Sequence, residues 1–529
     1  MNLLPSRRLG GLVGSGLLAG LLCVLAFAPF KQPLLAWIFP VPLVVAFFHF
    51  RPVRLSEAAA CGASAGLVFF GVSLFWLTEV TTAGWVALVL FCTFFHVVWC
   101  LVLGHLVREL PELLHTRASL VCAFFGAGAF TALEWIRGWI FTGFSWNSLG
   151  VSQIGLAAVS QIAELGGVHL LSWLVVFCGM IFALTGIRLV QEARHLQSFR
   201  PHFEFMVAVI LIGGVLYFGA GRLVSHPAKL GELRVLAVQP DIPQDPWGSV
   251  MGAGEALQRC MSLTEVALAS GEPVDLLIWP ETPIPESLEE LPRFEEFQKR
   301  MVPRRVPAFL YGTILNRGFE ISNSAILTQQ DEPFVQFYDK MHLVIMGEYV
   351  PFASTFPFLR KLVPLGVDFT PGKEARVMSL GLEWRLAPLI CFEDILPRVA
   401  RRFLPGNPHV FVNVTNDGWF QKSAQSWQHF QHARFRCIEF RRPMIRVANN
   451  GVTGWVDERG VARMILRDPD TGRLQFPGTL RMAVPMVETR TTFYARWGDW
   501  PGWLSLWLVL AAGVRAWVRS PLKRRLKKS

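Results

Sequence analysis

The stretch Ala387-Pro388-Leu389-Ile390-Cys391-Phe392-Glu393-Asp394 is an apolar run that ends in a cysteine and then meets acidic residues. A short run of this kind, bounded by polar residues, is typical of a strand that is buried on both faces. Similar runs lie elsewhere in the same region, at Leu233–Gln239, Asp275–Trp279, Ala308–Thr313 and His409–Val414. Helix-like segments lie between them, for example at Gly254–Ser270 and Leu291–Val302. The pattern predicts one α/β domain over residues 225–500.

Cys391 lies where its predicted strand stops, so its thiol is expected at the exposed tip of a strand-to-helix turn. The N-terminus of a helix at such a turn favours a thiolate or an oxyanion. A lone cysteine in an apolar run is, however, more often part of the core. The role of Cys391 therefore depends on which charged residues accompany it.

Glu281 and Lys340 are the charged residues that a cysteine nucleophile needs. Glu281 follows the predicted strand at 275–279, and Lys340 lies in the segment Asp339-Lys340-Met341-His342-Leu343. A free thiol has a pKa of about 8.5, so a neighbouring carboxylate must take its proton near neutral pH. An ammonium group stabilises the oxyanion of a tetrahedral intermediate, and Glu348 could hold that lysine or polarise the site. Each charge alone is more often a solvated surface residue, but together they favour an acyl-transfer site.

The remainder of the chain is too apolar for an ordinary soluble enzyme. Of its 529 residues, 52% are hydrophobic and only 17% are charged, and the mean hydropathy is +0.39. A membrane-spanning helix requires about 20 apolar residues. Stretches near this length lie at 9–28, 34–50, 58–78, 84–106, 119–141, 166–187, 205–223 and 502–518. We therefore expect seven membrane helices in residues 1–224, and an eighth, followed by a basic tail, in residues 501–529.

Basic residues occur in alternate connections between these stretches. They are Arg7, Arg8, Arg51, Arg54, Arg108, Arg117, Arg188, Arg194, Arg200 and, in the tail, Lys523, Arg524, Arg525, Lys527 and Lys528. The opposite connections carry almost none, with Lys31 as the main exception. The positive-inside rule then predicts that both termini are cytoplasmic and that residues 225–500 lie outside, in the periplasm of a bacterium. The net charge of +11 is interpreted as loop charge, because no basic stripe interleaved with aromatic residues indicates nucleic-acid binding.

The first apolar stretch has an alternative interpretation as a signal peptide. Arg7 and Arg8, the apolar core and Ala26-Phe27-Ala28 imitate the three regions of such a peptide. Pro29 follows directly and would make a poor first residue after cleavage. We therefore expect this helix to be retained.

The cysteine and histidine pattern indicates neither a metal nor a cofactor. The chain has no CxxC motif and no zinc spacing, and the pair His429-x-x-His432 is expected to be structural. Cys260 and Cys437 lie in the predicted outer domain, where a disulfide is permitted but not required. The basic run from Arg434 to Arg446 could grip a phosphate group, but such a helix more often carries internal salt bridges and a solvated face.

These segments resemble the carbon–nitrogen hydrolase, or nitrilase, superfamily over residues 235–456. With the apolar stretches, the resemblance narrows to the membrane-bound apolipoprotein N-acyltransferases and extends over nearly the whole chain. The motifs that carry it, besides the segments holding Glu281, Lys340 and Cys391, are Gln239–Gln244, Asn413–Phe420, Trp427–His429, Ala433-Arg434, Arg442-Pro443, Asn449–Thr453, Phe493–Arg496 and Gly498-Asp499.

The resemblance implies an α-β-β-α sandwich attached to an α-helical membrane bundle of eight transmembrane helices. It implies that Glu281 is the general base, Lys340 the oxyanion stabiliser and Cys391 the nucleophile. It further implies supporting roles for Glu348, Glu393 and Phe392, and positions beside the substrate for Trp247, Trp419 and Tyr349. A tyrosine is common in the family where this chain has Phe392, so the hydrogen bond of that phenol is missing here.

The function implied is transfer of an acyl chain from a phospholipid, typically the sn-1 chain of phosphatidylethanolamine, through a Cys391 thioester. The acceptor would be the α-amine of the N-terminal diacylglyceryl-cysteine of a lipoprotein. The protein would be a monomer in the bacterial inner membrane, in contact with membrane lipids and without metal, cofactor or nucleic acid. Two alternatives stay open: a membrane-tethered amidase that uses the same three residues, and a transporter or receptor whose outer domain binds a ligand.

Overall fold

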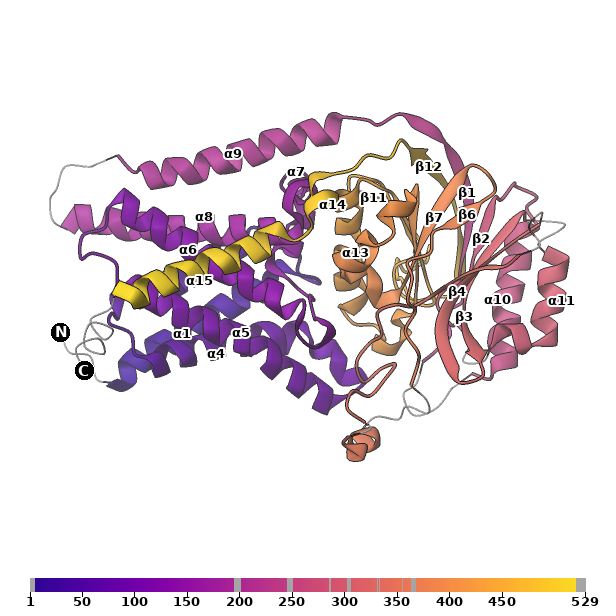
Figure 1. The fold of residues 1–529 in the computed structure, drawn as a ribbon, viewed down its shortest axis with the longest axis horizontal. Helices are drawn as coiled ribbons and strands as arrows, with labels where there is room; N and C mark the ends of the chain where they lie inside the picture. The colour runs from indigo at the N-terminus through magenta and orange to yellow at the C-terminus, as the bar shows by residue number, and fades with distance from the viewer. Residues whose placement is uncertain are drawn as a thin grey trace. The chain divides into compact units, whose positions relative to one another are not determined.

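A computed structural model describes residues 5–194, 201–244, 251–284, 287–301, 306–330, 332, 334–353, 355–362 and 368–519. The chain forms two compact units (Figure 1). One consists of Met1–Val224 with Arg496–Ser529, and the other of Ser225–Ala495. The predicted basic tail at 523–528 and the predicted substrate-side residue Trp247 lie outside the described residues.

The first unit is α-helical, and among its described residues six helices are long and apolar enough to cross a membrane, judged by length and composition. They are α1 (Pro5–Ala26), α4 (Leu55–Ser73), α5 (Thr82–Arg108), α6 (Thr116–Arg137), α8 (Ala163–Arg194) and α9 (Phe203–Val224). Small residues allow close packing between some of them. A Cβ at Gly16 of α1 would lie 2.1 Å from Ser64 Oγ on α4, which only glycine permits. These six helices support the predicted α-helical membrane bundle, though not its exact number of helices.

The predicted span at 34–50 differs from what the structure shows. This stretch forms two helices in direct succession, α2 (Leu35–Ile38) and α3 (Pro40–His49), which together make an apolar helical segment, Leu35–His49, that is shorter than the six long helices. Proline is favoured at the first position of a helix, and Pro40 begins α3 there. The last predicted span forms α15 (Trp500–Arg519), which has 20 residues but is not among the six. The number eight thus stays a prediction.

The second unit contains two six-stranded sheets. The first has the order β12-β1-β2-β3-β4-β5, and the second β11-β10-β9-β8-β7-β6. Their bounds are β1 (Lys229–Gln239), β2 (Leu276–Ile278), β3 (Ala308–Arg317), β4 (Glu320–Gln329), β5 (Gln336–Asp339), β6 (Met378–Leu380), β7 (Trp384–Ile390), β8 (Val410–Thr415), β9 (Met444–Ala448), β10 (Gly454–Val456), β11 (Ala462–Ile465) and β12 (Gly478–Val487). All five strands predicted from apolar runs are confirmed.

Helices cover the outer faces of these two sheets, as Figure 1 shows for α10 (Ala253–Leu268) and α11 (Pro292–Met301) on one side and α13 (Gln425–Phe440) on the other. Alternate residues of β1 face opposite layers, as the two-residue period of a strand requires. Val235 packs in the core shared by both sheets, whereas Leu236 packs in the core beneath α10 and α11. The sandwich places polar residues at the ends of buried strands, where a site can form between the sheets.

Candidate active site

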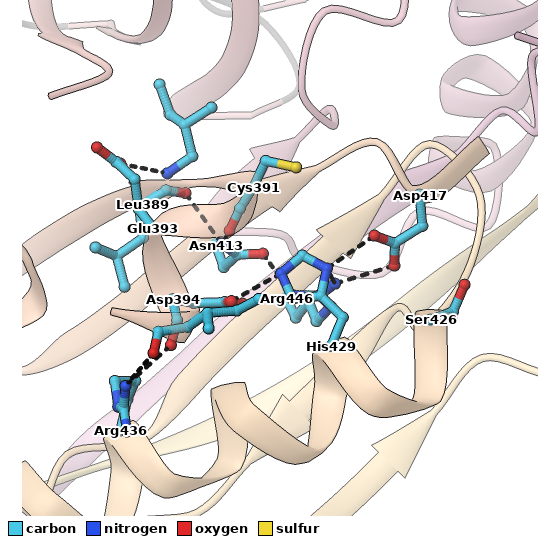
Figure 2. Close-up of polar contacts among 12 residues, drawn as sticks. Leu389, Cys391, Glu393, Asp394, Asn413, Asp417, Ser426, His429, Arg436 and Arg446 are labelled. Atoms are coloured by element: carbon cyan, nitrogen blue, oxygen red, sulfur yellow. Dashed lines mark hydrogen bonds and ion pairs between the residues drawn. The ribbon is translucent and has the colours of Figure 1, made fainter. Parts of the chain in front are cut away.

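Cys391 occupies a sharp turn between β7 and the 3-10 helix η6 (Cys391–Ile395). Its φ is +51°, a left-handed conformation that costs a non-glycine residue about 1–3 kcal/mol unless its surroundings hold it. Two hydrogen bonds do so: Glu393 accepts from the amide of Ile390 at 2.9 Å, and the Asn413 amide donates to the Cys391 carbonyl at 3.1 Å. In Figure 2 the sulfur atom points away from Asn413. The predicted strand-to-helix turn is thus present, with a half-buried thiol.

A second group of polar side chains comes from the first sheet and joins Glu281, Lys340 and Glu348. The ammonium of Lys340 lies 3.2 Å from Glu281 Oε1 and 2.9 Å from Glu348 Oε1. The amide of Asn323 donates to the same two oxygens, at 2.9 Å each. All four side chains are buried. The structure therefore brings together three residues that the sequence singled out, and adds Asn323.

Asn323 was not predicted from the sequence, although a signal was present. It is the middle residue of Ser322-Asn323-Ser324, a polar triplet inside strand β4 that is followed by the apolar run Ala325-Ile326-Leu327. All three residues are buried, and buried polar groups need hydrogen-bond partners. A polar triplet in a buried strand therefore indicates that its side chains meet other polar groups, here two carboxylates.

The charges in this site fix the protonation of the lysine and the thiol. Burial lowers the pKa of Lys340, but the carboxylates of Glu281 and Glu348 outweigh it and hold that pKa well above its usual value. Burial, followed by the negative charge of Glu281, raises the pKa of the Cys391 thiol, and Lys340 offsets only part of this rise. The free protein therefore keeps a protonated thiol beside a carboxylate. Attack by sulfur requires that a base remove the proton.

Glu393 connects the turn at Cys391 with the segment that holds Lys340. Its carboxylate accepts from Tyr338 Oη at 2.8 Å and from the amides of Met341 at 2.8 Å and His342 at 3.0 Å, in addition to the Ile390 amide. Burial raises its pKa to about 7, against the opposing effect of these hydrogen bonds. A fully buried carboxylate that accepts hydrogen bonds from four donors can fix the position of the Lys340 segment relative to the turn at Cys391.

The residues predicted to lie beside the substrate, Trp419 and Tyr349, are partly accessible to solvent. Trp419 lies in the short helix η8 (Asp417–Phe420) and is partly exposed, and Tyr349 is half-buried directly after Glu348. The ring of Phe392 stacks on His342 with centroids 5.9 Å apart. The phenyl ring therefore still packs where the family commonly has a tyrosine.

The basic run after residue 434 does not form a solvated face, so that part of the prediction was wrong. Arg436 is fully buried and pairs with Glu439 at 2.8 Å. The guanidinium of Arg442 is also buried and donates to the carbonyl of Pro408. Arg436 is internal because α13 is covered on nearly all sides, and Arg442, just after this helix, is buried as well. Neither side chain is accessible for binding a phosphate group.

His429 is likewise buried, between two carboxylates. Its Nε2 lies 2.8 Å from Asp394 Oδ1 and its Nδ1 lies 2.8 Å from Asp417 Oδ1 (Figure 2). Cys260 and Cys437 are both free and buried; they belong to separate cores. The structure thus assigns His429 to an ionic cluster, and shows no disulfide between the two cysteines.

The proton on His429 should make the stability of the folded protein depend on pH. Burial lowers its pKa, but Asp394 and Asp417 outweigh this and bring the pKa to about 9, against an ordinary value of 6.5. A proton held more tightly in the folded state contributes stability that is fully present below about pH 6.5 and is lost as the pH rises through about 9. The difference in thermal unfolding midpoint between wild type and His429→Gln, measured in detergent, should therefore shrink across this range. A difference that grows with pH would contradict the charged imidazole.

The close contact between Gly312 on β3 and the turn that carries Glu281 leads to a second prediction. A Cβ at Gly312 would lie 2.6 Å from the Pro280 carbonyl oxygen and 2.7 Å from Glu281 Cα. Gly312→Ala must therefore displace the turn that carries the carboxylate. For the acylation of Cys391 that the family resemblance implies, we expect a rate about tenfold or more lower, as a sub-ångström to 1 Å displacement commonly causes, measured by intact mass after mixing with phospholipid. Gly318→Ala, whose Cβ meets nothing within 4 Å but whose φ is +80°, controls for strain alone and should leave the rate unchanged.

Comparison with known proteins places this site in a family. The model of the apolipoprotein N-acyltransferase N-terminal domain matches residues 19–181, and that of carbon-nitrogen hydrolase matches residues 234–475. The second range includes Glu281, Lys340 and Cys391. The sequence resemblance to both is thereby confirmed.

Three curated relatives extend the match over almost the whole chain. The apolipoprotein N-acyltransferase of Chlorobaculum tepidum is 32% identical, with 96% of each chain covered. That of Methylococcus capsulatus is 31% identical over 94% of each chain. That of Geobacter metallireducens is 30% identical over 92% of this chain and 91% of the relative. Identity at this level over both units shows that the chain belongs to the apolipoprotein N-acyltransferase family.

Proposed function

We propose that this N-acyltransferase moves an acyl chain from a phospholipid to Cys391, and from there to the α-amine of a lipoprotein's N-terminal diacylglyceryl-cysteine. The observation that carries the proposal is the half-buried Cys391 thiol, at a strained turn, beside the buried group of Glu281, Lys340 and Glu348. Covalent catalysis of this kind splits one difficult exchange into two easier steps. The apolar helices of the first unit suit substrates that are both anchored in a bilayer.

The first step forms a thioester. Glu281 takes the proton from Sγ of Cys391 as the sulfur attacks the ester carbonyl carbon of the phospholipid, and Lys340 stabilises the resulting oxyanion. When this intermediate collapses, the C–S bond stays and the ester C–O bond breaks. The departing glycerol oxygen receives the proton held by Glu281, so the lysophospholipid leaves neutral at that oxygen and Glu281 is again ionised.

The second step forms the amide. The neutral α-amine of the lipoprotein attacks the thioester carbonyl, and Lys340 again faces the oxyanion. Glu281 takes a proton from the attacking nitrogen, the C–N bond stays, and the C–S bond breaks. The sulfur regains that proton from Glu281, which returns the thiol to the protonated state that its raised pKa favours.

We further propose the membrane arrangement predicted from the charges. The six long apolar helices, together with the stretches at 34–50 and 502–518, would form the bundle, with both termini in the cytoplasm and the α/β unit in the periplasm. This arrangement would place Cys391 on the periplasmic side of the membrane. Labelling of a cysteine introduced at the exposed position Leu382, by a membrane-impermeant maleimide on intact spheroplasts, should occur; labelling only after lysis would reverse the orientation.

The experiment that tests the reaction is intact-mass measurement after incubation with phosphatidylethanolamine, for wild type and Cys391→Ala. We expect an added acyl mass on the wild type, its absence in the variant, and its discharge by a diacylglyceryl-cysteine peptide that becomes N-acylated. An adduct that water discharges but the peptide does not would favour a membrane-tethered amidase. If the wild type gains no mass from presented lipid, the thioester mechanism is wrong and ligand binding becomes the better explanation.

A further inference from the structure

The ionic cluster around His429 continues to Arg446 on β9. One guanidinium nitrogen of Arg446 lies 2.5 Å from Asp394 Oδ2, and the other lies 3.1 Å from Asp417 Oδ2. Asp394, Asp417, His429 and Arg446 are each at most 1% exposed. We call these four residues the buried ionic cluster (Figure 2). None of the four takes part in the reaction described above.

Asn413 joins the buried ionic cluster to the nucleophile. Asn413 and Arg446 are neighbours across the parallel strands β8 and β9, and Arg446 donates to Asn413 Oδ1 at 2.8 Å. With its oxygen held in this way, the Asn413 amide nitrogen is aimed at the Cys391 carbonyl, 3.1 Å away. Asp394 lies three residues after Cys391 in the same 3-10 helix. The cluster therefore holds the nucleophile turn both at the carbonyl of Cys391 and at Asp394.

The positive and negative charges of the four cluster residues compensate one another. Each ring nitrogen of His429 lies 2.8 Å from a carboxylate oxygen, and Arg446 Nη2 also lies 3.0 Å from Nδ1. Because Asp394 and Asp417 bring the pKa of His429 to about 9, the imidazole is positively charged near neutral pH, and two cations then face two anions in a buried site. A neutral imidazole would leave one buried negative charge uncompensated, which is strongly unfavourable. The other charged groups near the cluster are Arg436, which is already paired with Glu439, and Lys340 and Glu281 beyond the thiol. Balance inside the cluster therefore depends on its own four members.

We propose that His429 and Arg446 are positioning residues for the acyl transfer: through Asn413 and Asp394, the charge-balanced cluster holds Cys391 in its left-handed conformation with the sulfur directed toward Glu281 and Lys340. This rests on the proposed role of Cys391 as nucleophile. The cluster acts on the reacting sulfur only through other residues. Its loss should slow attack rather than weaken substrate binding.

The test compares variants that unbalance the cluster with one that restores the balance. His429→Gln removes one positive charge, and His429→Gln with Asp394→Asn removes one charge of each sign. Glu439→Gln removes an equally buried charge from the same helix, and its partner Arg436 contacts the far end of η6, at the carbonyl of Ile395, rather than Asn413 or the Cys391 carbonyl. Asn413→Ser breaks the link to the Cys391 carbonyl without changing any charge. The rate constant of acylation by phosphatidylethanolamine is measured in single turnover, per molecule whose Cys391 reacts with iodoacetamide.

We expect His429→Gln and Asn413→Ser to lower this rate constant by on the order of tenfold to a hundredfold, with unchanged half-saturation by lipid. The double variant should recover most of the loss, and Glu439→Gln should match the wild type. Equal losses for Glu439→Gln and His429→Gln, or a wild-type rate in Asn413→Ser, would overturn the proposal. Asn413→Ser keeps the test decisive if the charge variants do not fold.

The rate of iodoacetamide alkylation separates this proposal from the proposed function, because alkylation needs no lipid. The unbalanced negative charge in His429→Gln disfavours the thiolate, so its Cys391 should be alkylated more slowly than that of the wild type and of the double variant. If His429→Gln merely loosened the turn, alkylation would be faster, and the proposal would fail even where acyl transfer is confirmed. If the variants change the alkylation rate as expected but no lipid acylates Cys391 of the wild type, the acyl-transfer reaction is rejected and the positioning role of the cluster is kept.

Discussion

Glu281→Gln is expected to lower the rate of Cys391 acylation by about 10²–10⁴-fold at neutral pH, the usual contribution of a general base. Glutamine keeps the size of the side chain but cannot take the proton of a thiol whose pKa is raised. Loss of the Glu281 charge also removes one cause of that rise. The difference in acylation rate between the wild type and Glu281→Gln should therefore become smaller at alkaline pH, where hydroxide can deprotonate the thiol. Intact-mass measurement of single-turnover acylation at neutral and at alkaline pH gives both values.

Glu348→Gln is the matched control for this prediction. Glu348 contacts the same lysine and the same Asn323 amide, but its other oxygen accepts from the Val344 amide, which ties it to its own loop. We expect it to hold Lys340 rather than to accept the thiol proton, so that Glu348→Gln slows acylation less and equally at both pH values. The assignment of the base to Glu281 would be rejected if the two variants exchanged these profiles.

The fold could be predicted where the sequence pattern is local. Each predicted strand is a contiguous apolar run. Glu281 and Cys391 lie where such runs end, after β2 and β7, and the packing of the two sheets that hold these strands brings the two residues to one site. The span at 34–50 could not be separated from a single helix by its composition, because the division between α2 and α3 depends on the backbone at Pro40. Periodicity and length therefore predicted the existence of elements better than their continuity.

The site could be predicted only for residues whose chemistry stands out by itself. His429 and Arg446 find their partner Asp394 at separations of 35 and 52 residues, and nothing along the chain records that pairing. A dense run of arginines was therefore interpreted as a partly solvated helix face, whereas tertiary structure buries it. Asn323 shows the intermediate case, in which a polar triplet inside a strand marks buried contacts without naming their partners.

Lys340→Met is expected to have the largest combined effect, on both stability and rate. Two buried carboxylates would be left facing each other without the ammonium that now lies about 3 Å from each. Removing one partner of a buried ion pair typically costs about 3–5 kcal/mol, and removing one oxyanion donor lowers the rate by about 10²–10³-fold. Thermal unfolding in detergent measures the first effect, and single-turnover acylation of the folded fraction measures the second.

A second substitution can separate these two effects of Lys340. Lys340→Met combined with Glu348→Gln removes one charge of each sign, so the buried group returns to a single carboxylate with a neighbouring amide from Asn323. We expect the double variant to regain most of the thermal stability, since the uncompensated repulsion is gone. Acylation should stay slow, because no cation remains to face the oxyanion. Recovery of the rate together with the stability would show instead that Lys340 serves the fold alone, and that the oxyanion is stabilised by other donors near Cys391.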